Sequence, residues 1–292
     1  NTKQDILSSR DTKITTISNS QINFPYIKIT DTNSFFNGSN YKNNTIIGKN
    51  TPDTNNSSTW GAQNTIIGAY AAETLSSNTV SASGIVCIGS AAMRGHATDL
   101  NADSNTCIGN RAFGKYSNSM IPSGSGCIII GSWSGVDSAG NSRICIGNTA
   151  GRQSLISERS VMIGHASGYG ANNAYECIYI GQEAGRSSTA GGSSQQGNVG
   201  IGKWALRQSG THTRHVIRTV AVGHEAGEMC DSSYSVMLGW DAGEASAAGN
   251  SVLVGYRAGE NLSNGQATIA IGSEAGNSSS GTKNVFIGDR CG

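Results

Sequence analysis

A three-residue apolar run that ends at a glycine recurs along most of this chain. In every copy the run begins with a β-branched residue and closes with Ile, Val or Leu, and Asn or Ser often precedes it. Fourteen such glycines follow one another at spacings of 16 to 22 residues. They are Gly48, Gly68, Gly89, Gly109, Gly131, Gly147, Gly164, Gly181, Gly202, Gly223, Gly239, Gly255, Gly272 and Gly288. Self-similarity at such a period predicts a solenoid, in which each repeat forms one coil that stacks on its copies.

We number the positions of each repeat from this glycine, which is position 0. The apolar run occupies positions −3 to −1 and has the length and composition of a short strand. Side chains alternate between the two faces of a strand, so positions −3 and −1 share one face. We expect that face to fill the interior of the coil. At position −1 this predicted core includes Ile146, Ile180, Ile271 and Ile287.

Position −2 then points outward, where a soluble solenoid built on one sheet would carry polar residues. Instead it is Ile, Cys, Met, Tyr, Ala, Leu or Phe in every repeat but one, which has Gly200. A strand that is apolar on both faces is buried on both. We therefore expect a homo-oligomer in which this second face packs on identical chains. Three chains around one axis are the first expectation.

The residues after the glycine predict a tight corner. Position +3 is Ala in ten repeats, and position +4 is Gly in nine. Ala permits close stacking, and Gly supplies the positive φ that a sharp corner needs. The turn glycines of this framework include Gly147, Gly181, Gly223, Gly239, Gly255, Gly272 and Gly288. The longer repeats carry their extra residues after this corner, and we expect these to form loops on one edge.

These patterns predict an all-β chain with two parts. Residues 42–292 form a parallel β-solenoid of 14 coils with 16–22 residues each. Residues 1–41 do not repeat, and the apolar alternation between Ile22 and Ile29 fits either a strand or two leading into the solenoid or a connector to an upstream shaft. No secretion signal follows Asn1 and the last residues complete a repeat, so we expect a segment of a longer chain.

The composition narrows the class of protein. The 292 residues include 40 Gly and 3 Pro, and charged residues make up 13%, about half the usual share. This profile suits stacked turns with uncharged corners rather than a helical enzyme. The formal net charge of +1 gives no global field for nucleic acid or an anionic membrane. No apolar run approaches the ~20 residues of a membrane helix, so we expect neither nucleic-acid binding nor membrane insertion.

Written as N-x-V-x-I-G-x-x-A-G, the repeat resembles two groups of proteins. One is the repeat region of the tail fibres of bacteriophages and other viruses, and the other is the β-roll head of trimeric autotransporter adhesins. The best-matching segments are Asn198–Gly202, Asn284–Gly288, Gly181–Gly185 and Gly272–Gly276. The resemblance covers Asn43–Gly292 and implies a left-handed, homotrimeric β-solenoid. The uneven coil lengths and the 7 Cys depart from the adhesin heads and favour a viral fibre.

The polar and sulfur-containing residues give no clear chemistry, and we expect no catalytic residue, no metal and no cofactor. The cysteines occupy small or apolar positions without a C-x-x-C pair, so they are interpreted as buried free thiols. The alternatives are that Cys87 and Cys107, on adjacent coils, form a bridge or that they meet their copies near an axis. Charges of changing sign recur at position +2 and predict a solvated ion-pair ladder. The alternative is that Glu225 and Asp241 are paired carboxylates for glycoside cleavage.

The strongest binding hypothesis concerns aromatic residues that follow the glycine. Trp133 and Trp204 occupy position +2, and Trp240 and Tyr256 occupy position +1 on consecutive coils. Exposed aromatic faces can stack on sugar rings, so these four are the candidate glycan contacts. The alternative is that they cover coil flanks or pack between subunits. The basic loop His212–Arg218 is a second candidate, for contact with an anionic sugar or a neighbouring chain.

Together these features favour a structural fibre or receptor-binding segment of a virion, similar to a tail fibre, that mediates attachment to the host cell surface without catalysis. Its expected partners are identical chains, other fibre or virion proteins and a host surface glycan. The first alternative is the head of a bacterial trimeric surface adhesin, which would place the chain on the bacterial cell surface. The second is a glycan-depolymerising tailspike. A shared fold does not choose among these functions.

Overall fold

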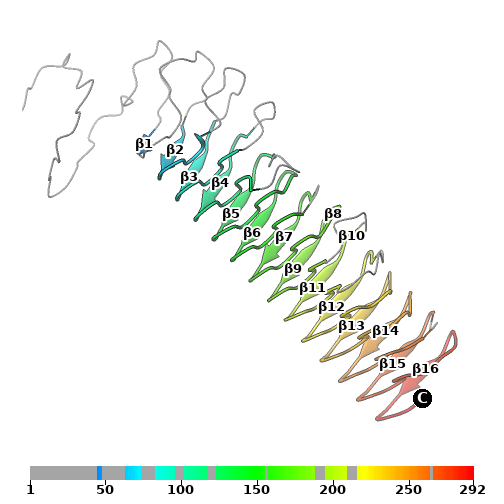
Figure 1. Cartoon of the computed structure of the whole chain (residues 1–292). Helices are drawn as coiled ribbons and strands as arrows, with labels where there is room; N and C mark the ends of the chain where they lie inside the picture. The colour runs from blue at the N-terminus through cyan, green and yellow to red at the C-terminus, as the bar shows by residue number, and fades with distance from the viewer. Residues whose placement is uncertain are drawn as a thin grey trace, which may run out of the picture. The chain divides into compact units, whose positions relative to one another are not determined.

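The computed structural model describes residues 45–47, 63–73, 83–95, 102–116, 123–154, 157–187, 195–208, 216–263 and 266–292. Within them, fourteen short strands form one parallel sheet and follow one another in chain order (Figure 1). The strands are β1 (Thr45–Ile47), β2 (Thr65–Ile67), β3 (Val86–Ile88), β4 (Thr106–Ile108), β5 (Ile128–Ile130), β6 (Ile144–Ile146), β7 (Val161–Ile163), β9 (Ile178–Ile180), β11 (Val199–Ile201), β12 (Val220–Val222), β13 (Val236–Leu238), β14 (Val252–Val254), β15 (Ile269–Ile271) and β16 (Val285–Ile287). The predicted non-repeating segment, residues 1–41, lies outside the described residues.

Every strand occupies positions −3 to −1 of its repeat, and neighbouring strands pair in register. Between β9 and β11, for example, Ile178 lies opposite Val199 and Tyr179 lies opposite Gly200. The described residues contain no α-helix, and the structure traces a parallel β-solenoid of about 11 turns. The segments that link the first four strands include residues outside the described ranges. The predicted fold class, an all-β chain with a parallel solenoid, is confirmed, although the solenoid has about 11 turns where 14 coils were predicted.

The other sides of the coil carry shorter parallel pairings. β8 (Ala174–Tyr175) and β10 (Gln195–Gln196) form a two-stranded sheet. Isolated bridges join further coils, such as the bridge between Ser263 and Ser280. Each coil therefore contributes one strand to the main sheet and is closed by turns. The hydrogen bonds of those turns also run from coil to coil.

Burial reverses the orientation that we predicted for the strands. The side chains at position −2 face inward, and nearly all of them are fully buried, as at Ile66, Cys87 and Leu253. The residues at position +3 are buried with them, as at Ala184 and Ala258. One continuous hydrophobic cluster therefore runs through the interior of the coils. It is narrow, because small residues line one of its sides.

The four isoleucines predicted for the core lie on the outer face of the sheet instead. Ile271 is 39% exposed and Ile287 is 68% exposed, while Ile146 and Ile180 are half-buried. The apolar pattern could not distinguish the two faces, because both are apolar. The available volume determines which face is inside. A narrow, close-packed interior requires side chains whose sizes fit their neighbours, and the side chains at position −2 vary in size from coil to coil.

The glycine at position 0 is required by both conformation and stacking. Its φ is +130° at Gly164 and similar in the other coils, a region that residues with a Cβ rarely adopt. A Cβ at Gly164 would also lie 2.5 Å from the carbonyl oxygen of Gly181 in the next coil. Position 0 glycines thus stack directly on one another, and any side chain there would push two coils apart.

Buried polar side chains form a ladder along the corner before the strands, at position −4. Asn105 donates from Nδ2 to the carbonyl of Gly124 at 2.8 Å, and its Oδ1 accepts the N–H of Cys127 at 2.9 Å. Asn198 and Ser235 repeat this pair of bonds in later coils. These side chains satisfy backbone groups that the corner leaves outside the sheet, and they join each coil to the next.

Candidate functional site

Beside the sheet, the residues at positions +1, +2 and +5 form a polar and aromatic strip that we call the corner ridge. After β9, β11, β12, β13, β14 and β15 it comprises Gln182, Glu183, Arg186, Lys203, Trp204, Arg207, His224, Glu225, Glu228, Trp240, Asp241, Glu244, Tyr256, Arg257, Glu260, Ser273, Glu274 and Asn277. The position +2 residues have left-handed backbones, with φ of +59° at Glu225 and +54° at Asp241. Their N–H groups donate to the preceding coil, as from Asp241 to the carbonyl of His224 at 3.0 Å. Equivalent side chains therefore stack from coil to coil.

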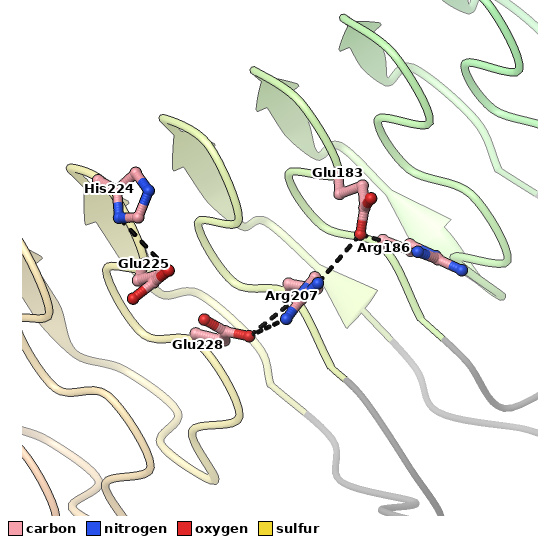
Figure 2. A network of polar contacts seen from close by, with 6 residues as sticks. All are labelled: Glu183, Arg186, Arg207, His224, Glu225 and Glu228. Atoms are coloured by element: carbon pink, nitrogen blue, oxygen red, sulfur yellow. Dashed lines mark hydrogen bonds and ion pairs between the residues drawn. The ribbon is translucent and has the colours of Figure 1, made fainter.

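Charges alternate along the first part of the corner ridge. Figure 2 shows Arg207 between two carboxylates: its Nη1 lies 3.1 Å from Glu183 Oε2, and its Nε donates to Glu228 Oε1 at 2.9 Å. Arg186 also donates to Glu183, at 2.8 Å. Burial raises the pKa of Glu183, but the hydrogen bonds from the two arginines outweigh it and hold the pKa below its usual value. This ladder joins positions +2 and +5, which was not predicted. The ion pairs predicted along position +2 form further on, between Asp241 and Arg257 and between Glu274 and Arg290.

The alternation breaks at the next two coils, where four carboxylates come together. Glu225 and Glu228 follow β12, and Asp241 and Glu244 follow β13. A carboxylate oxygen of Glu225 and one of Asp241 lie within 4.8 Å of each other, and burial, followed by the neighbouring carboxyl group of Asp241, raises the pKa of Glu225. Burial and the charges of Asp241, Glu260, Glu228 and Glu225 raise the pKa of Glu244 to about 7. The carboxylates of this group therefore oppose one another's ionisation.

Two atoms at the centre of this group lack hydrogen bonds. Asp241 is 5% exposed, and its Oδ1 has no hydrogen-bond partner. Its other oxygen, Oδ2, lies 3.5 Å from Arg257 Nε, and Arg257 is shared with Glu260 at 3.4 Å. His224 Nδ1 lies 3.5 Å from Glu225 Oε1 and is buried without a hydrogen bond. A buried polar atom without a partner is costly and calls for a physical explanation.

Two overlapping sets of side chains have the spacing of metal ligands. His224, Glu225 and Asp241 each offer one ligand atom within 4.8 Å of the others, and so do Glu225, Glu228 and Glu244. The structure brings together Glu225 and Asp241, the pair named for the predicted alternative of glycoside cleavage: a carboxylate oxygen of each lies within 4.8 Å of the other.

Two of the four predicted glycan-contact residues have their rings covered by cations. Trp133 is half-buried, and the guanidinium carbons of Arg111 and Arg152 lie 4.5 Å and 5.0 Å from its ring centroid. Trp204 is flanked by a lysine and an arginine of its own coil, at 4.2 Å and 4.1 Å. Cation–π contacts of this kind occupy the ring faces that a sugar would need.

The other two predicted aromatic residues remain open to solvent. Trp240 is 57% exposed and Tyr256 is 42% exposed. Their ring centroids are 6.4 Å apart, and their planes are nearly perpendicular. His224 continues the row, 5.1 Å from Trp240. Trp240 and Tyr256 therefore keep ring surface free for contact with a ligand.

The outer face of the sheet is a second candidate surface, which we call the sheet face. Its aliphatic residues at positions −3 and −1 are 36% to 68% exposed at the following sites: Ile128, Ile178, Ile201, Val222, Leu238, Val252, Ile269, Ile271, Val285 and Ile287. No charged residue occupies either position in any repeat. A contiguous exposed apolar surface marks a site of interaction. We expected an apolar external face at position −2, and the structure has it at positions −3 and −1.

The cysteines are free thiols, including Cys87 and Cys107, which are paired across β3 and β4. Six are buried as predicted, and Cys291 is partly exposed. Burial raises the pKa of Cys87 to about 12 and that of Cys145 to about 11. These thiols stay protonated near neutral pH and act as packing groups.

Most of the predicted basic loop His212–Arg218 lies outside the described residues. His212, Arg214 and His215 lie outside the described residues, whereas Arg218 stacks over the ring of Tyr234 at 5.7 Å.

Comparisons with known proteins do not assign a family. No family model matches the chain, and no curated protein matches it. In the part of the chain that the structure describes, no helix is long and apolar enough to cross a membrane. The functional argument therefore rests on the sheet face and the corner ridge.

Proposed function

We propose that this chain is a structural fibre segment of a virion, similar to a tail fibre, that assembles as a homotrimer and mediates attachment to the host cell surface without catalysis. The observation that carries the proposal is the sheet face. Exposed Ile, Val and Leu side chains recur along the solenoid with no charge at their positions. Left in water, such a surface promotes aggregation, so the protein needs a cover for it.

An identical chain is the cover that fits this surface best. The exposed side chains recur once per coil at the spacing of neighbouring strands, about 4.8 Å. A second copy of the solenoid presents the same residue types at the same spacing, so matching coils can pack along the whole length. Three such faces around one axis cover one another equally in a closed, symmetric assembly. The left-handed coil implied by the resemblance to viral fibres and adhesin heads belongs to the same proposal.

A fibre also needs stiffness along its length, and three features supply it. The strands pair in register from coil to coil, the position 0 glycines stack without room for a side chain, and buried side chains such as Asn105 connect neighbouring corners. Each coil contacts only its neighbours, so the array resists bending as one unit.

Attachment to a host is assigned to the exposed aromatic residues of the corner ridge. Trp240 and Tyr256 present open ring surface on consecutive coils. Aromatic rings of this kind stack on sugars, so a host surface glycan is the proposed ligand. Other fibre or virion proteins would complete the assembly.

The two alternative functions share parts of this argument. The head of a bacterial surface adhesin would use the same sheet face and differ in location, so antibodies against the purified chain would label bacterial surfaces rather than virions. A depolymerising tailspike would use the carboxylates of Glu225 and Asp241, which lie within 4.8 Å of each other, and would release sugars from a host glycan, which the proposed fibre would not.

The first test is the mass of the folded particle by native mass spectrometry or light scattering. We expect three chains. The variants Val222→Lys and Leu238→Lys place charge on the sheet face, where both residues are more than a third exposed, and should release monomers or soluble aggregates. The matched control is Gln266→Lys, an exposed site away from the strands, which should leave the mass unchanged.

The outcomes separate the steps of the proposal. A stable wild-type monomer would contradict the role of the sheet face. A dimer would retain that face as an interface and overturn the three-fold arrangement. Three chains in all variants would show that another surface holds the assembly together.

A further inference from the structure

The corner ridge contains a pair of carboxylates that the fibre proposal does not explain. Glu225 and Asp241, on successive coils, each bring a carboxylate oxygen within 4.8 Å of the other. Two ionised carboxylates this close repel each other, and a shared proton or a bound cation relieves that repulsion. His224 lies beside them, with its Nδ1 3.5 Å from Glu225 Oε1.

The burial of Asp241 is an independent sign of a missing ligand. The residue is 5% exposed, so water solvates it poorly, and no hydrogen bond from the described residues reaches its Oδ1. That carboxylate takes part in the set in which the ligand atoms of His224, Glu225 and Asp241 all lie within 4.8 Å of one another. Opposite ligands of a divalent ion bound at 2.0–2.6 Å are about 4–5 Å apart, so the set has the size of a coordination shell.

Neighbouring cations do not neutralise the group. Arg257 lies 3.5 Å from Asp241 Oδ2, but it is 42% exposed and is shared with Glu260. Arg207 forms ion pairs with Glu228 and with Glu183 of an earlier coil. Among the described residues, no arginine pairs with Glu225 or Glu244, which leaves negative charge for a bound cation to balance when they are ionised.

We propose that His224, Glu225 and Asp241 bind one divalent cation between the coils that follow β12 and β13. Asp241 Oδ1 and His224 Nδ1, the two buried atoms without hydrogen bonds, become ligands together with a carboxylate oxygen of Glu225. Glu244 lies in the overlapping acidic set beside the site. From the sequence we expected no metal, because no ligand motif marks these residues.

The ligand types indicate which cation to expect. One imidazole with two carboxylates suits zinc or manganese, whereas calcium prefers an all-oxygen shell. By joining two coils, the ion would fasten the corner ridge next to Trp240, which stacks near His224 at 5.1 Å. The site is independent of the oligomeric state, since all three ligands belong to one chain.

The test is isothermal titration calorimetry of the whole assembled protein after treatment with a chelator, with zinc, manganese and calcium chloride in separate titrations. Thermal unfolding with and without each ion is the second measurement. Asp241→Asn and His224→Gln remove one ligand each and keep the side-chain shape. The matched control is Glu274→Gln, which also changes a position +2 carboxylate, one that pairs with Arg290 on the last coil.

We expect one zinc or manganese ion per chain and a higher midpoint of unfolding when it is bound. Asp241→Asn and His224→Gln should weaken binding by about ten-fold or more, while Glu274→Gln should bind like the wild type. Without metal, Asp241→Asn should be at least as stable as the wild type, because it removes a repulsive charge. The proposal is overturned if no ion binds, or if Asp241→Asn binds zinc as tightly as the wild type. Calcium binding that survives His224→Gln, with no zinc or manganese binding, would also overturn the assignment.

Discussion

The ring of Tyr179 fills the space that Gly200 leaves on the neighbouring strand. The two residues are paired at position −2 across β9 and β11, and Tyr179 is 1% exposed. Its hydroxyl donates to Gln195 Oε1 at 2.6 Å and accepts from Asn198 Nδ2 at 3.4 Å. A large interior side chain is thus matched by the smallest one on the next coil.

This match predicts that Gly200 tolerates no side chain while Tyr179 is present. A Cβ at Gly200 would lie 3.1 Å from Tyr179 Cδ1 and 3.3 Å from the carbonyl oxygen of Ala205. Gly200→Ala should therefore lower the free energy of unfolding by about 1–3 kcal/mol through overpacking. Denaturant unfolding at fixed protein concentration measures this loss. In a Tyr179→Leu background, Gly200→Ala should lower the free energy of unfolding by less. An equal loss in both backgrounds would rule out the steric coupling.

A second prediction concerns the polar ladder at position −4. Asn198 Nδ2 donates to the carbonyl of Val216 at 2.7 Å, and its Oδ1 accepts the N–H of Thr219 at 3.0 Å. Asn198→Ala would leave these buried backbone groups unpaired and should cost about 2 kcal/mol or more in the free energy of unfolding. The matched control is Asn284→Ala, whose Nδ2 makes one long bond of 3.4 Å to the carbonyl of Ser280. Similar losses in both variants would show that the ladder adds no stability.

The sequence was sufficient to predict the strands, because a β-branched residue and a glycine bracket each of them. It could not predict which face is inside. Tyr179 opposite Gly200 held a clue, since interior residues on adjacent coils complement one another in size. The residues at positions −3 and −1, such as Ile178 and Ile201, lie on the exposed face of the sheet and need no such adjustment in size. In a narrow coil, variation in size is a better sign of the interior than hydrophobicity.

The corner ridge was predicted only in part, for a related reason. Stacking at position +2 correctly placed Glu225 beside Asp241. The residues at position +5, among them Arg207 and Glu244, were not considered, although they fold back against position +2. Arg207 therefore covers Trp204, a ring that we had predicted to contact glycan. The residue types at positions +2 and +5, taken together, predict both the covered ring of Trp204 and the acidic group around Glu225.

A third prediction concerns Arg143, which is fully buried at position −4. Its Nη1 donates to the hydroxyls of Ser138 and Ser157 at 3.0 Å and 3.2 Å, but its Nε and Nη2 have no hydrogen-bond partner. The guanidinium lies over the ring of Phe113 at 5.2 Å.

Replacing a buried, poorly paired charge by an apolar side chain of similar volume is often neutral, or stabilising by about 1–4 kcal/mol. We therefore expect Arg143→Met to unfold at the same or a higher denaturant concentration than the wild type. Arg143→Ala should be less stable than Arg143→Met, because it leaves a cavity. A large loss of stability in Arg143→Met would show that the charge itself has a partner or a role in the native protein.

The buried thiols predict how stability depends on alkaline pH. From an ordinary value of 9.0, burial raises the pKa of Cys87 to about 12 and that of Cys145 to about 11. Between the unfolded pKa of each thiol and its raised pKa in the folded chain, the folded chain keeps a proton that the unfolded chain has lost. A group whose pKa is raised by folding contributes stability that is fully present below its unfolded pKa and is lost as pH rises toward its folded pKa.

The free energy of unfolding should therefore fall above about pH 9, by up to about 1.4 kcal/mol per pH unit for each thiol. Denaturant unfolding from about pH 8 to about pH 11 measures this slope. Replacing both thiols, as Cys87→Ala with Cys145→Ala, should flatten the slope even though it lowers stability at pH 8 by creating cavities. Some slope should remain, because burial also raises the pKa of Cys107 and Tyr179. Parallel slopes in the wild type and the double variant would mean that other groups cause the alkaline loss.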